Sequence, residues 1–170
     1  MTRDLRAISI IVAASVLIAS GTSMAKPKAS TPEERAKAVS LAHDLEAQPI
    51  SDDAVEKRRW LVKWYEKVPD ITVTVCDLLG PFPNDDHPFF SQVLAQSMFS
   101  GGAFMIEHPN QANDQVVVQT AGVEGALKVY EVFVKAMPES RVPFLDDMLK
   151  KRDEGTLHAY MRDAVAKACK

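Results

Sequence analysis

The sequence lacks the short motifs that mark the commonest catalytic and ligand sites. It has no Gly-x-Ser-x-Gly turn, no glycine-rich phosphate loop, and no His-x-x-x-His or Glu-x-x-His pair with the spacing of helical metal ligands. Three histidines adjoin a carboxylate, but adjacent residues on a helix do not face each other. We therefore expect no metal, no other cofactor and no catalytic centre, and a metal-dependent enzyme is the least favoured alternative.

An excess of charge of one sign is also missing. The chain has 20 Lys and Arg residues against 23 Asp and Glu residues, a formal net charge of −3, and the two signs are mixed along it. Nucleic-acid binding needs a basic patch, and binding to a membrane surface needs a polybasic amphipathic helix. The sequence has neither, which argues against nucleic acid and against a membrane surface as partners.

The one extended apolar run lies near the N-terminus and is too short to span a bilayer. Residues 8–19 are apolar apart from two serines, follow Arg3 and Arg6, and precede Ser23-Met24-Ala25. A basic start, a short apolar stretch and small residues before the cut are the three parts of a cleavable secretory signal. We predict a signal peptide at 1–25, export to the periplasm or secretion, and no membrane span after cleavage. An uncleaved signal anchor is the alternative.

Cysteine is scarce, with Cys76 and Cys169 alone. In an oxidising compartment an even number of cysteines favours pairing, and no neighbouring residue pattern would activate a free thiol. A bond between them would close a loop of about 90 residues and hold a chain end that otherwise frays. We predict this disulfide, and a reactive thiol is the alternative.

The rest of the chain has a helical pattern. Residues 26–30 are predicted to be a disordered leader and residues 31–170 a single domain, large enough to bury a core. The predicted fold class is all-α, a compact bundle of five or six helices, because apolar residues recur at helical spacing. Helices are expected after the caps Thr31 (with Pro32 at the first position), Ser51 and Thr156, and over about 88–107, 110–136 and 144–154.

The segment at about 88–107 is apolar almost all round, which is typical of a buried central helix. Its Gly101-Gly102 pair lacks side chains and would let a neighbouring helix approach closely. The next predicted helix carries a stripe of small residues, namely Ala121, Gly122, Gly125 and Ala126. We expect this stripe to meet the glycine pair.

Residues 71–75, Ile-Thr-Val-Thr-Val, fit two structures. Their alternation and β-branching are typical of a strand, whose one candidate partner in a minor β-hairpin is 116–118. A lone hairpin is marginally stable, and Asp70 can instead cap a short helix ended by Gly80. Because the rest of the chain is helical, we favour the helix.

The lead functional hypothesis is a non-enzymatic interaction, accessory or inhibitor module with an unknown protein partner in the cell envelope. Tryptophan anchors many interfaces, and the turn-rich loop 80–88 exposes polar and aromatic side chains. The alternative for the tryptophans is packing at the rim of the core. The predicted partner surface is Trp60, Trp64, Phe82, Asp85 and Asp86.

The second hypothesis is a carrier of an apolar small molecule or lipid. Aromatic and methionine side chains gather along the central apolar segment, and flexible methionines suit an adaptable cavity. Simple filling of the core is the alternative. The predicted cavity residues are Phe90, Leu94, Met98, Phe104 and Met105.

Overall fold

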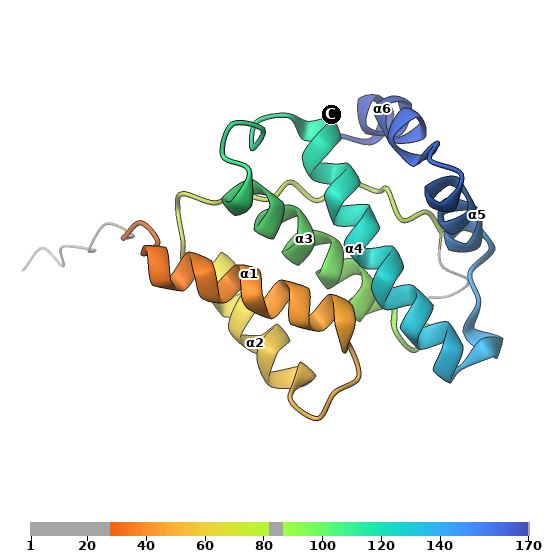
Figure 1. Cartoon of the computed structure of the whole chain (residues 1–170), viewed down its shortest axis with the longest axis horizontal. Helices are drawn as coiled ribbons and strands as arrows, with labels where there is room; N and C mark the ends of the chain where they lie inside the picture. The colour runs from red at the N-terminus through yellow and green to blue at the C-terminus, as the bar shows by residue number, and fades with distance from the viewer. Residues whose placement is uncertain (1–27, 82–86, 170) are drawn as a thin grey trace, which may run out of the picture.

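The computed structural model describes residues 28–81 and 87–169. Within that part of the chain the regular structure is helical, without strands, so the predicted all-α class is confirmed (Figure 1). The predicted signal peptide and three predicted surface residues, Phe82, Asp85 and Asp86, lie outside the described residues. The elements are α1 (Pro32–Ala47), α2 (Ala54–Tyr65), α3 (Phe90–Glu107), α4 (Gln115–Ala136), the 3₁₀ helix η1 (Pro138–Ser140), α5 (Pro143–Asp153) and α6 (Leu157–Ala168).

The centre of the bundle is a pair of helices. Figure 1 shows α3 and α4 between α1 and α2 on one side and α5 and α6 on the other. The expectation of α3 as the single central helix is only partly met, because α4 packs against α1, α3, α5, α6 and η1. Buried side chains accordingly form two clusters, one joining α1 and α2 to α3, the other joining α4, α5 and α6 to the start of α3.

Close contact between α3 and α4 depends on small residues, as predicted. A β-carbon added at Gly122 would lie 2.6 Å from the backbone oxygen of Ser97, and one at Gly125 would lie 1.9 Å from Ser100 Oγ. Gly101 faces Val118 of α4, whereas Gly102 faces Tyr65 of α2. The two adjacent glycines of α3 therefore admit different neighbours.

The first helix begins as its sequence predicts. The Thr31 side chain accepts a hydrogen bond from the Glu34 amide (3.2 Å), and the Glu34 carboxylate accepts one from the Thr31 amide (2.8 Å). This reciprocal capping box satisfies two amide donors that have no partner inside the helix.

Other predicted boundaries were wrong in detail. Ser51 does not cap α2, since its hydroxyl donates to the Gln48 carbonyl oxygen (3.0 Å) and the helix begins at Ala54. The fourth helix begins at Gln115, later than expected, because the Asp114 carboxylate accepts from the first amides of α4. Local hydrogen bonds in the preceding turns determine where α2 and α4 begin, and such bonds cannot be predicted from apolar periodicity.

The prediction of a helix over residues 70–79 was wrong, and so was the minor β-hairpin. Residues 71–76 are neither helical nor paired, and 116–118 belong to the first turn of α4. Figure 1 shows this segment crossing the molecule behind α3 and α4. An extended chain rises about 3.3 Å per residue against 1.5 Å in a helix, so an extended run can span that width.

The predicted disulfide is confirmed. Cys76 and Cys169 are bonded, with their Cα atoms 5.2 Å apart. The bond ties the end of the extended segment to the residue that follows α6. It therefore joins two parts of the fold that lie 93 residues apart in sequence.

Candidate functional site

An apolar groove of about 310 Å³ opens between α2, the start of the extended segment and the middle of α3. This volume is at the lower end of the range of small-molecule pockets. Most of its wall is hydrocarbon and aromatic surface, to which α2 contributes Val62 and Tyr65, the extended segment Ile71 and Val73, and α3 Met98 and Phe99. Because three segments of the chain converge on this apolar wall, we take the groove as the candidate site.

The floor of the groove is a set of packed aromatic rings. Tyr65 stacks on Phe99 (ring centroids 6.1 Å apart) and meets Trp64 edge-on (4.9 Å). Its hydroxyl lies over Gly102, where an added β-carbon would be 2.0 Å from it, and donates a long hydrogen bond (3.4 Å) to the Phe99 carbonyl oxygen. Burial raises the pKa of the Tyr65 hydroxyl, which therefore stays neutral.

The near end of the extended segment is held in place by Ser30, which precedes α1, and by Arg35 of α1. The Asp70 carboxylate accepts hydrogen bonds from the Ser30 amide (3.0 Å) and hydroxyl (2.8 Å) and pairs with Arg35. These bonds lower the pKa of Asp70 to about 2, with the Ser30 amide as the largest cause. Ile71, Thr72 and Val73 follow directly and line the groove.

One ionised side chain lines the groove. Glu66 lies at its edge and is exposed, and its carboxylate forms no ion pair or hydrogen bond with any described residue. The groove is therefore apolar inside and carries at its rim a negative charge that no described residue pairs with.

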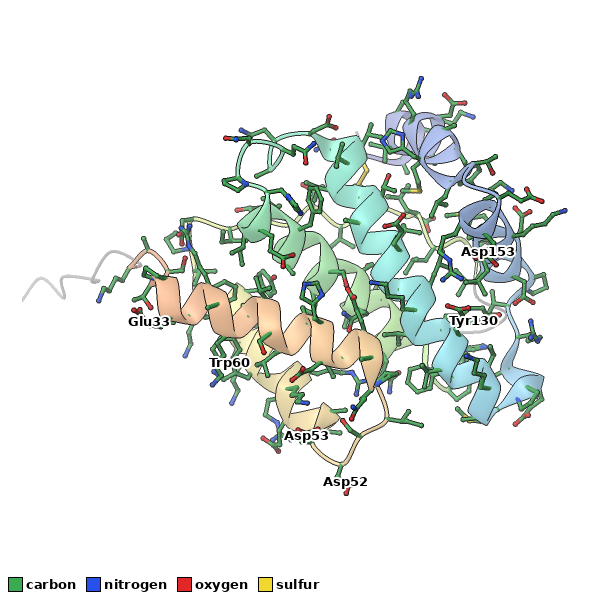
Figure 2. The ribbon with its side chains drawn as sticks, in the orientation of Figure 1. Glu33, Asp52, Asp53, Trp60, Tyr130 and Asp153 are labelled. Carbon is green, nitrogen blue, oxygen red and sulfur yellow. A yellow bond between two sulfur atoms is a disulfide. The ribbon has the colours of Figure 1, made fainter. Side chains whose placement is uncertain are left out.

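The two tryptophans predicted as a partner surface have different positions. Trp64 is buried (6% exposed) and belongs to the core cluster of α1, α2 and α3, so it is not part of an exposed surface. Trp60 is half-buried on the flank where α1 and α2 meet (Figure 2), stacked on Trp64 (5.9 Å) with the Lys37 ammonium 4.4 Å from its ring centre. Packing at the edge of the core accounts for both rings.

The five residues predicted to line one apolar cavity are spread along α3. Met98 alone lines the groove described above. Leu94 packs against the core cluster of α4, α5 and α6, and the Phe104 ring lies 4.4 Å from that of His108. Met105 lines a separate, more polar hollow with Pro69 and Ala112, and Phe90 is half-buried at the start of α3.

Sequence reasoning missed a buried polar cluster between α1, α3 and α4. Ser100 Oγ donates to Glu46 Oε1 (2.6 Å), and Gln96 Nε2 donates to Ser100 Oγ (2.9 Å) and to the Ala42 carbonyl oxygen (3.0 Å). Lys128 Nζ of α4 donates to Glu46 Oε2 (2.7 Å). The members lie far apart in sequence, and the one signal that could have found them is Gly125, which makes room for the Ser100–Glu46 pair.

This cluster is structural in its present form. Ser100 is only 4% exposed and its hydroxyl is already committed to Glu46, so no substrate atom can approach it. Burial opposes ionisation of Glu46, but hydrogen bonds from Lys128 and Ser100 outweigh it and lower the pKa of the carboxyl. Satisfied polar groups of this kind hold three helices in one arrangement.

His43 extends the cluster to the surface. Its Nδ1 lies 3.4 Å from Glu46 Oε2 and its Nε2 lies 3.1 Å from Glu107 Oε1. Partial burial lowers the pKa of the imidazole, but hydrogen bonding to Glu107 and the charge of Glu46 have the larger combined effect, and the net shift is upward.

His43 predicts a pH dependence of stability. A raised folded-state pKa stabilises the fold below the unfolded value near 6.5, and this contribution is lost as pH rises through the folded value. We expect His43→Gln to reduce the gain in melting temperature on going from about pH 8 to about pH 6, whereas His158→Gln, an exposed control on α6, leaves it unchanged. An equal gain in melting temperature for His43→Gln and the parent protein would contradict this prediction.

Two further features are absent from residues 28–81 and 87–169. No group of three or more His, Cys, Asp or Glu side chains is arranged to hold a metal ion. In the same ranges, none of the helices has the length and hydropathy required to cross a membrane.

Comparison with protein-family models, with curated proteins and with solved structures finds no match to this chain. The site therefore has to be interpreted from its own geometry.

Proposed function

We propose that this protein is a non-enzymatic interaction module, exported from the cytoplasm, whose partner contacts the apolar groove between α2 and α3. The observation that carries the proposal is the groove itself, an apolar hollow of about 310 Å³ that opens to the surface beside exposed apolar side chains. Contiguous exposed apolar surface on a small protein is typical of a binding site.

The exposed face of α2 extends this surface. Val62 is 42% exposed at the edge of the groove, and Val55 is 60% exposed seven residues earlier. Residues seven apart lie on the same face of a helix, two turns from each other. A partner that fills the groove can therefore also cover both valines.

Export is part of the proposal because of the signal-like N-terminus and the cysteine pair. A disulfide persists in oxidising compartments and is rare where glutathione and thioredoxin keep thiols reduced. The Cys76–Cys169 bond is compatible with such a compartment, and sequencing the N-terminus of the mature protein would test the cut after Ala25.

A capture experiment with matched variants tests the groove as the contact. The bait is the disulfide-bonded protein, immobilised and exposed to an extract of the source cells. We expect Val62→Glu to lose a protein that the parent retains, because a carboxylate would enter an apolar contact. Ile50→Glu changes a side chain of similar exposure (57%) in the loop before α2 and should capture normally. Equal capture by both variants would remove the groove from the interaction.

A second candidate function is the carriage of an apolar small molecule, which the volume and apolar wall of the groove favour. We expect N-phenyl-1-naphthylamine, a neutral fluorescent probe, to bind there. Gly102→Ala should lower the affinity for the probe severalfold, because the new β-carbon displaces the Tyr65 ring. In Gly101→Ala the new β-carbon makes ordinary contacts of 3.5 Å or more, so the affinity should not change. Equal probe affinity of the parent protein and both variants would count against this function.

A further inference from the structure

We propose that residues 71–75 are a docking edge for an extended segment of a partner protein, which adds to them as a β-strand and places an apolar side chain in the groove and a basic one beside Glu66. This inference rests on the proposed function and names the chemistry of the partner at the same site.

The first observation is a row of unpaired backbone groups. None of the amide N–H groups of residues 71–75 forms a hydrogen bond with a described residue. Among their carbonyl oxygens, that of Thr74 alone has a partner within the described ranges, the Gln119 side-chain amide at 2.6 Å. Thr72, Thr74 and Val75 are exposed, so solvent or another chain can reach this edge. An unpaired extended edge is a ready template for a further strand.

The second observation is that the edge is held in place before any partner binds. Hydrogen bonds from Ser30 to Asp70 fix the start of the segment, and the disulfide of Cys76 fixes its end. Side chains between these points are β-branched, which favours extended backbone. Binding to a segment that is already ordered loses less conformational entropy.

The third observation is the position of the groove along this edge. Ile71, Thr72 and Val73 have free backbone groups and also line the groove. In strand addition, main-chain hydrogen bonds supply affinity and pockets for alternate side chains supply specificity. An extended polypeptide meets both requirements, whereas a lipid or a small apolar molecule would leave the amide edge unused.

The charge at the rim indicates a second side chain of the partner. Glu66 is exposed and has no ion pair among the described residues, so a Lys or Arg two positions from the inserted apolar side chain, on the same face of the added strand, would complement it. Residues 70–77 of a second copy offer two aspartates and no basic residue. Self-pairing through the same edge would therefore bring no cation to Glu66, and a different chain is the better occupant.

A fluorescein-labelled probe peptide, acetyl-Ser-Val-Thr-Leu-Thr-Lys-Ser-amide, has Leu and Lys on one face of a strand and tests the proposal on the intact disulfide-bonded protein. We expect saturable binding by fluorescence anisotropy, together with slower amide hydrogen exchange at residues 71–75. The same peptide with N-methylated backbone amides should not bind, because it cannot pair as a strand. No saturable binding at millimolar protein, or binding without protection of 71–75, would overturn the proposal.

Matched substitutions locate the contact. Thr74→Pro removes one amide donor at an exposed position and should lower the affinity for the probe about tenfold. Thr74→Ala keeps the donor and should bind the probe with the affinity of the parent protein. Equal melting temperatures would exclude a folding defect. Glu66→Lys should lower the affinity for the Lys peptide and raise the affinity for a version of the peptide with Glu in place of Lys. Equal affinity of Thr74→Pro and Thr74→Ala would refute strand addition.

Two further outcomes separate this proposal from the proposed function. If Thr74→Pro captures the same partner as the parent and Val62→Glu does not, the groove receives another kind of surface, so strand addition is refuted and the proposed function stands. If neither variant changes capture of the partner, strand addition and the proposed function are both refuted. A concentration-dependent dimer in sedimentation that Thr74→Pro abolishes would assign the edge to a second copy and overturn the partner proposed here.

Discussion

Removing the disulfide by the double substitution Cys76→Ala and Cys169→Ala is expected to lower the free energy of unfolding by about 4–5 kcal/mol. The bond joins residues 93 apart in sequence, and a cross-link over so long a loop removes much of the entropy of the unfolded chain. The total stability of a domain is about 5–15 kcal/mol, so this loss would remove a large share of it. Urea denaturation at 25 °C, followed by circular dichroism, measures the change.

The same experiment reports on the extended segment. Because Cys76 holds its far end, the backbone order of residues 71–75, measured by ¹⁵N relaxation, should fall in the double variant more than that of α4 does. Reduction of the parent protein with dithiothreitol gives an independent comparison without new side chains. A double variant that unfolds at the urea concentration of the oxidised parent would contradict the assigned role of the bond.

Gly122→Ala is expected to destabilise the fold by about 2 kcal/mol, although alanine favours helices over glycine. The added β-carbon would lie 2.6 Å from the backbone oxygen of Ser97, and the contact is relieved only if α3 and α4 move apart. These two helices form the most extensive interface in the bundle and carry both core clusters, so separating them loosens the packing on both sides.

Gly101→Ala is the matched control for Gly122→Ala. Its β-carbon would make contacts of 3.5–3.7 Å with Val118 and Val73, which is ordinary van der Waals distance. We expect Gly101→Ala to leave the stability unchanged or slightly higher, because alanine has the higher helix propensity and its β-carbon makes no steric clash. Thermal melts of the two variants side by side test the assignment, and equal melting temperatures would show that the α3–α4 spacing does not depend on Gly122.

The disulfide and the small-residue interface were both predictable, for different reasons. Two cysteines in a chain with a signal-like start leave a single intramolecular pairing, so counting residues was enough. The stripe that contains Gly122 and Gly125 lies on one face of a regular helix, and helical periodicity can be read from sequence. The residue that each glycine meets was not predictable, since it depends on how two helices cross.

The groove illustrates what local patterns miss. Its walls come from the end of α2, from residues 71–73 and from the middle of α3, and none of these stretches shows a ligand motif. Of the residues predicted for a cavity, Met98 alone lies in the wall, because the prediction took all of them from one helix, whereas three separate segments form the groove. The buried pair of Ser100 and Glu46 was missed for the same reason, since its partners lie 54 residues apart.

Composition, apolar periodicity and capping chemistry determined the helical class, the start of α1 and the pairing of the cysteines, because each depends on neighbouring residues or on a count. Tertiary structure alone decided the path of residues 71–76. Their β-branched sequence permits a strand and tolerates a short helix, and the folded chain holds the two ends of the extended form through the hydrogen bonds of Ser30 to Asp70 and the bond of Cys76 to Cys169. Long-range anchoring leaves that backbone edge unpaired beside the groove.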